Sequence, residues 1–156
     1  MSAIKTQVAA RSFIEAEVRA NRIPAGATTN LDLFKIPAGA SIGLIKWTLK
    51  EPFADATGTI TAVTATVGDE DDGDGFIEAK SVWGASSPIA HAQTDGAYGE
   101  IDDDAEDTVL VPGSFKLYSE DKAFRVAIAK TGAGNATARF KTGRLLLTIE
   151  ILQPRS

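Results

Sequence analysis

Apolar and polar residues alternate one by one in several stretches of this chain. The clearest stretch, residues 145–151, has Leu145, Leu147 and Ile149 at one parity and Glu150 at the other. Successive side chains of a β-strand point to opposite faces, so a period of two predicts strands with one buried face. Similar alternation predicts further strands over residues 14–19, 45–50 and 124–130.

Weaker extended stretches and frequent turn residues complete this pattern. Residues 31–36, 58–68 and 108–118 are rich in residues that suit strands, and we expect the last stretch to break at Pro112, because proline cannot donate to a sheet ladder. Turn residues such as Pro37-Gly39 and Pro112-Gly113 separate the predicted strands. No long helical stripe interrupts them. The sequence therefore predicts an all-β fold, an antiparallel β-sandwich of jelly-roll-like type.

The predicted strands form one domain. We expect a single β-sandwich domain over residues 12–156, preceded by an extended N-terminal arm over residues 1–11. The arm either pairs with a neighbouring subunit or is a loosely held terminus. Residues 81–107 are small, polar and weakly periodic, which predicts a long loop interrupted by a short strand near residues 98–101.

Composition excludes several function classes. The 156-residue chain has no cysteine, which rules out disulfides, thiolate metal sites and cysteine nucleophiles, and it has one histidine, His91. Its net charge of −5 lacks the dense basic face of nucleic-acid binders, so we expect no direct nucleic-acid contact. No apolar run approaches the length of a membrane span or a signal peptide. We therefore expect no membrane partner and no export by the general secretory route.

An acidic stretch resembles the first half of a calcium-binding loop. Glu70, Asp72 and Asp74 occupy the first, third and fifth places, and Gly75 occupies the sixth, where a sharp bend is needed. The twelfth place holds Ser81 instead of the bidentate glutamate that closes such loops. Two interpretations stay open: an acidic hairpin turn, which we favour, and a calcium site at Glu70, Asp72 and Asp74.

No catalytic constellation stands out. A second acidic run over residues 102–107 has no ligand spacing and is typical of a solvated loop. A nucleophilic-serine elbow is absent around His91, and the loop acids lack the fixed pairing that glycoside hydrolysis needs. We therefore expect no enzyme. Trp47 belongs to the apolar face of a strand and is assigned to the core, while Trp83 either packs under the long loop or stacks on a partner.

Three segments together resemble small virion structural proteins of tailed bacteriophages, in particular capsid cement or decoration proteins. A Thr/Val-rich strand leads into VGDEDDGDGFIEAKSV, and SFKLYSEDKAFRVAIA and the closing strand GRLLLTIEIL follow it. The resemblance covers roughly residues 28–152 and consists of strand order and the "GD…DGF" loop. It implies a jelly-roll-like fold without an active site.

The resemblance also implies partners. It implies a protein, often a homotrimer, that binds the major capsid protein on the capsid surface of the virion after assembly in the host cytoplasm. From position alone we expect capsid or subunit contacts at Ile4, Val8, Trp83, His91 and Tyr98. The alternative is a carbohydrate- or receptor-binding module of a phage tail or fibre. In that case Trp83, Tyr98 and the acidic loop form a calcium-assisted sugar site.

Overall fold

The computed structural model describes five parts of the chain: residues 9–83, 90–92, 95–96, 99–100 and 116–154, with side chains for 11–83 and 116–153. These parts contain ten strands and one turn of 3-10 helix, and none of their helical residues forms a segment able to span a membrane. The elements are β1 (Ala9–Arg19), η1 (Ala20–Arg22), β2 (Thr28–Ile36), β3 (Ser41–Asp55), β4 (Ile60–Asp69), β5 (Ile77–Ser81), β6 (Ala90–Ala92), β7 (Asp95–Gly96), β8 (Gly99–Glu100), β9 (Lys122–Gly132) and β10 (Phe140–Pro154).

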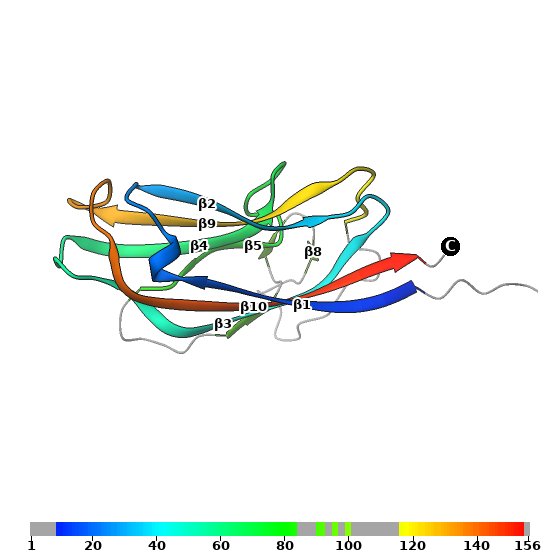
Figure 1. Ribbon diagram of the computed structural model, residues 1–156, viewed down its shortest axis with the longest axis horizontal. Helices are drawn as coiled ribbons and strands as arrows, with labels where there is room; N and C mark the ends of the chain where they lie inside the picture. The colour runs from blue at the N-terminus through cyan, green and yellow to red at the C-terminus, as the bar shows by residue number, and fades with distance from the viewer. Residues whose placement is uncertain (1–8, 84–89, 93–94, 97–98, 101–115, 155–156) are drawn as a thin grey trace, which may run out of the picture.

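Eight of these strands form two antiparallel sheets stacked as a sandwich (Figure 1). One sheet has the order β1-β10-β3-β6 and the other β2-β9-β4-β5, while β7 and β8 form a separate short ladder. Numbered along the chain, the eight sandwich strands run 1-8-3-6 in one sheet and 2-7-4-5 in the other, which is the arrangement of a jelly roll. The predicted all-β, jelly-roll-like sandwich is confirmed.

The predicted alternation places the apolar faces of both sheets in one core. Leu147 of β10 lies opposite Trp47 of β3, and Val67 of β4 lies opposite Val126 of β9. All four are fully buried, which confirms the core assignment of Trp47. Burial of such side chains is the main favourable term in folding. Other buried members of the core include Ile45, Leu49, Phe53, Val63, Phe76, Phe124, Ile128, Leu145 and Ile149.

Strand β1 begins earlier than the sequence predicted. Ala9 pairs with Pro154 and Arg11 pairs with Leu152, so residues 9–11 belong to the sheet and not to an arm. The start of β1 and the end of β10 lie side by side at one end of the sandwich (Figure 1). Three residues with modest strand propensity are held in the sheet here by their pairing with β10. The remainder of the predicted arm, residues 1–8, lies outside the described residues.

The predicted long loop also contains more strand structure than expected. Strand β6 pairs with the outer edge of β3, with His91 opposite Trp47, and β8 falls where a short strand was expected. In the predicted extended stretch at residues 108–118, Leu117 forms only an isolated bridge to Ser41, and residues 108–115 lie outside the described part.

Candidate functional site

Asp69, at the end of β4, organises the acidic loop that connects β4 to β5. Its carboxylate is fully buried and accepts hydrogen bonds from Lys116 Nζ and the Tyr118 hydroxyl, both at 2.7 Å. It also accepts the backbone N–H groups of Asp71 and Asp72, both at 2.9 Å. Asp69 therefore joins the acidic loop to residues 116–118, which lie far along the chain. We call this group the Asp69 clasp.

The clasp is an ion pair at neutral pH. Burial by itself raises the pKa of Asp69, but the hydrogen bonds from Lys116, Tyr118 and the Asp72 N–H outweigh burial and lower the pKa below its ordinary value. Lys116 Nζ also lies 4.8 Å from the centre of the Tyr118 ring. A buried carboxylate is tolerated here because charged and polar donors surround it.

Of the three residues predicted to bind calcium, Asp72 and Asp74 lie together in this loop, and Glu70 binds β9 instead. Glu70 Oε1 accepts the backbone N–H of Ala123 at 3.1 Å, while a hydrogen bond with Asp74 raises the pKa of Asp72. Among the residues with described side chains, no group of three or more His, Asp or Glu is placed to hold a metal ion. Calcium binding at Glu70, Asp72 and Asp74 therefore stays a prediction, and it requires Glu70 to leave β9.

Both ends of the segment 84–115 are anchored on the sandwich. At its start, the Val82 carbonyl accepts the N–H of Phe53 at 2.9 Å, and the Val82 N–H donates to Val63 at 3.0 Å, so Val82 bridges the two sheets. At its end, Tyr118 exchanges backbone hydrogen bonds with Gly39 and Ala40 at 2.7 and 2.9 Å. The Asp69 clasp adds to this second anchor. The residues on either side of this segment are therefore fixed to the sandwich.

Of the five residues predicted to make capsid or subunit contacts, the structure describes the side chain of only one. Trp83 is half-buried, packs against the core and bridges to Phe53. The backbone of His91 lies in β6, but its side chain, like Ile4, Val8 and Tyr98, lies outside the described part. The structure therefore places one of the five side chains, and their role in contacts stays a prediction.

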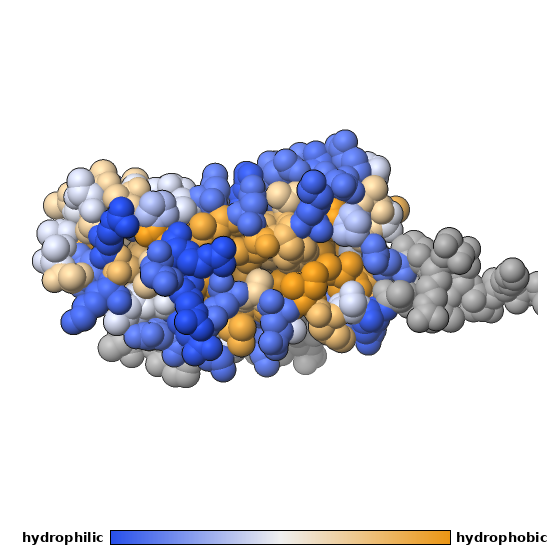
Figure 2. Space-filling view, in the orientation of Figure 1, coloured by the Kyte–Doolittle hydropathy of each residue, from blue (hydrophilic) through white to orange (hydrophobic). Residues whose placement is uncertain are grey.

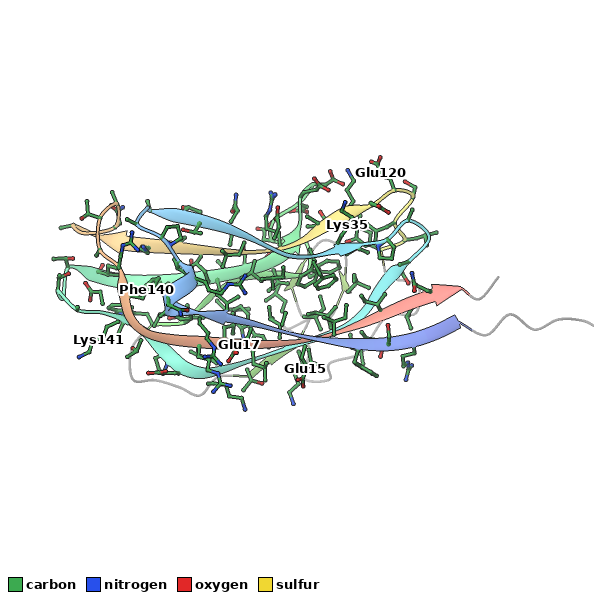
Figure 3. The ribbon with its side chains drawn as sticks, viewed as in Figure 1. Glu15, Glu17, Lys35, Glu120, Phe140 and Lys141 are labelled. Carbon is green, nitrogen blue, oxygen red and sulfur yellow. The ribbon has the colours of Figure 1, made fainter. Side chains whose placement is uncertain are left out.

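A groove with a mixed apolar and charged lining runs between β1 and β2, the edge strands of the two sheets. Ile14, Ala16, Leu33 and Phe34 line it, and its volume is about 350 Å³. Figure 2 shows apolar surface across the middle of this face, with hydrophilic side chains around it. Figure 3 shows Glu15 and Glu17 pointing from β1 away from the second sheet. Further lining residues are Glu15, Glu17, Arg19 and Arg22.

Charged and aromatic side chains share the outer face of β1. Glu17 accepts hydrogen bonds from Arg144 and from Arg19 Nε, and these two arginines, Arg144 first, lower the pKa of Glu17. Phe13 occupies a position on the same face and is 59 % exposed. Phe13 was not singled out in the sequence analysis. The signal that could have identified it is a large apolar residue at a position that shares its strand face with charged residues.

Comparison with known proteins finds similar structures but no similar sequence. No protein-family model and no curated protein matches the chain. A chain in the capsid asymmetric unit of cyanophage Pam1 has a similar fold, with a TM-score of 0.61 and 15% identity over 99% of this chain and 93% of that one. A chain of the capsid of Helicobacter pylori bacteriophage KHP30 matches with a TM-score of 0.57 and 12% identity over 96% and 94%. At these identities the likeness is one of fold.

Proposed function

We propose that this chain is a structural protein of a phage virion that binds the outside of the capsid and stabilises it, as cement or decoration proteins do. The observation that carries the proposal is the likeness to chains of two phage capsids over nearly the whole length of both partners. The matched chains are therefore small proteins of similar length with the same jelly-roll architecture. Jelly rolls are common in viral capsid proteins, which supports the assignment.

The partners of this proposed function are the major capsid protein and further copies of the chain, arranged as a homotrimer. Such a protein stabilises a shell by burying contact area and by adding strands to exposed sheet edges. It requires no catalytic group, and the chain supplies neither cysteine nor more than one histidine. Its proposed place is the capsid surface, after assembly in the host cytoplasm.

Charge supports segment 84–115 as the part that faces the capsid. The segment contains seven Asp and Glu residues and no Lys or Arg, whereas the whole chain has a net charge of −5. The rest of the chain therefore has a net charge of +2. The residues that flank the segment, Val82 and Tyr118, are hydrogen-bonded to the sandwich. We propose that this segment, with Trp83, His91 and Tyr98, contacts a basic surface of the capsid.

Co-sedimentation with phage heads that lack this protein tests the function. The full chain is expected to pellet with heads up to a fixed copy number and to be displaced by raised salt. Failure of the full chain to pellet at any ratio, in low salt, would refute the proposed function.

A truncated variant tests the arm separately. Deleting residues 1–8 removes Ile4 and Val8 but leaves every β1–β10 pair intact, whereas deletion through residue 11 also removes three of these pairs. We expect the shorter deletion to melt like the full chain and to bind heads more weakly. If the shorter deletion variant binds heads as tightly as the full chain, the arm has no role in binding, but the proposed function still stands.

The alternative, a carbohydrate- or receptor-binding module of a tail or fibre, has one supporting feature. Jelly rolls also occur in lectins. However, Trp83 is packed against the core, which leaves less of its ring for a sugar. Binding to a glycan array that disappears in chelator, together with no binding to heads, would favour this alternative.

A further inference from the structure

Strand β1 is a long, regular sheet edge that lacks several common protections against pairing, although it carries charged side chains. It has eleven residues without proline or glycine, and its pairing with β10 shows no bulge. The other outer strands differ: β2 has a register shift between Asp32 and Phe34, β5 has five residues and β6 has three. Natural edges are commonly blunted by bulges, prolines or short length. Among the described strands, none pairs with the outer side of β1.

The outer face of β1 is complementary to the same face of a second, antiparallel β1 strand. Arg11, Phe13 and Glu15 follow one another on this face, and all three are exposed. In an antiparallel pair centred on Phe13, Arg11 of one copy lies opposite Glu15 of the second copy, and the reverse pair forms by symmetry. The two Phe13 rings then face each other. Within its own chain, Arg11 Nε also lies 3.5 Å from Glu150 Oε2. Opposite charges and aromatic pairs at directly opposed positions stabilise a sheet.

We propose that a second copy of this chain is the partner of this edge, and that two copies join their β1 strands antiparallel about Phe13. The two four-stranded sheets then continue as one sheet of eight strands across a two-fold axis. The contact is isologous, with the same patch on both copies. It goes beyond capsid binding and is separate from a trimer, which needs a head-to-tail interface elsewhere on the surface.

Other registers fit less well. Moving the centre to Ile14 puts Phe13 opposite Glu15 of the second copy, and it pairs Arg11 with Glu17, which Arg144 and Arg19 already hold. Moving it to Glu15 brings the two Glu15 side chains together and sets Arg11 against Arg19. Like charges directly opposed destabilise a pair of strands. The register about Phe13 is the one that combines two Arg11–Glu15 pairs, two Phe13 rings facing each other and no like-charge pair over residues 9–17.

The pairing also covers apolar surface. Ile14 and Ala16 are half-buried and line the groove beside the β1 edge. A strand added to this edge lies at the mouth of the groove, because neighbouring strands are spaced by about 4.8 Å. Contact of this kind removes Phe13 and part of the groove from water, which favours association.

Site-directed crosslinking tests the pairing and its register without any capsid. The chain has no cysteine, so the variant F13C carries a single thiol, and mild oxidation is expected to join two copies through this position. The control E17C places its two thiols roughly 26 Å apart along the paired strands and is expected to stay uncrosslinked. A mixture of R11C and E15C is expected to crosslink, whereas each alone is not.

The oligomeric state gives a second readout. The variant F13D places two carboxylates at the two-fold axis and is expected to weaken self-association at least about tenfold in sedimentation experiments. Because Phe13 is exposed, F13D should melt like the parent chain. The proposal is overturned by F13C that crosslinks no faster than E17C, or by F13D that associates as tightly as the parent. Neither result bears on binding to heads, which the co-sedimentation experiment measures.

Discussion

Replacing Asp69 by asparagine removes the charge of the clasp and keeps its shape. The amide oxygen of D69N can still accept the N–H groups of Asp71 and Asp72, but Lys116 and Tyr118 lose a charged acceptor. Removing one partner of a buried ion pair typically costs about 3–5 kcal/mol. The Lys116 side chain is 22% exposed and can recover some hydration. We therefore expect D69N to lower the free energy of unfolding by about 2–3 kcal/mol.

The loss should depend on pH in a defined direction. The pKa of Asp69 in the folded protein lies below its ordinary value of 3.8. A lowered carboxyl pKa stabilises the fold at pH values above the unfolded-state pKa, and this contribution disappears as pH falls through the folded-state pKa. The difference between the parent chain and D69N should therefore be full at pH 7 and should shrink in acid below pH 3.8.

Urea denaturation measures this difference. At pH 7 the midpoint of D69N should move down without a change in slope, and its melting temperature should fall by about 5–10 °C. The matched control is D71N in the same loop, because the Asp71 side chain is 50% exposed and its ion pairs with lysine lie at the surface. A loss below about 0.5 kcal/mol for D69N, or a loss that persists unchanged in acid, would refute the account of the clasp.

Three further predictions concern stability and binding. K130M should lower the free energy of unfolding by about 1–2 kcal/mol in urea, because Lys130 Nζ donates to the carbonyls of Pro24 and Ala138 at 3.1 and 3.0 Å; an unchanged midpoint would contradict this. G143A should cost about 2 kcal/mol or more, since Gly143 has a φ of 146° and a Cβ there would overlap the Phe53 ring; a parent-like melting temperature would show that the ring moves freely. Calcium bound by the acidic loop should raise the melting temperature by a few degrees at about 10 mM, and no shift would end the calcium hypothesis.

Local patterns predicted the long strands but missed β5 and β6, and they did not predict how the strands assemble. Alternation in β10 and β3 located the buried faces, because side-chain direction depends only on position along a strand. The jelly-roll order pairs strands far apart in the chain, such as β1 with β10, and periodicity carries no information about which edges meet. The pattern also underestimated β1, where Ala9 and Ala10 are strand residues because β10 pairs with them.

The candidate sites, like the strands, were predictable from local sequence only in part. The acidic loop was recognisable from the spacing of Glu70, Asp72 and Asp74, but the residue that organises it is Asp69, which stands just before them. Its partners Lys116 and Tyr118 are 47 and 49 positions away, so only the folded chain reveals the clasp. Phe13 was visible in the sequence as an apolar residue among charged ones, but only the folded chain shows that it lies on the outermost of the described strands of its sheet.

Stabilisation of the shell is the central claim, and heat-induced release of packaged DNA measures it directly. Heads lacking this protein are heated with and without the purified chain, and release is followed with a DNA-binding dye. We predict that the chain raises the release temperature in a saturable way, and that D69N does so less at temperatures near its own melting point. Release at the same temperature with and without a saturating amount of the chain would contradict the proposed function.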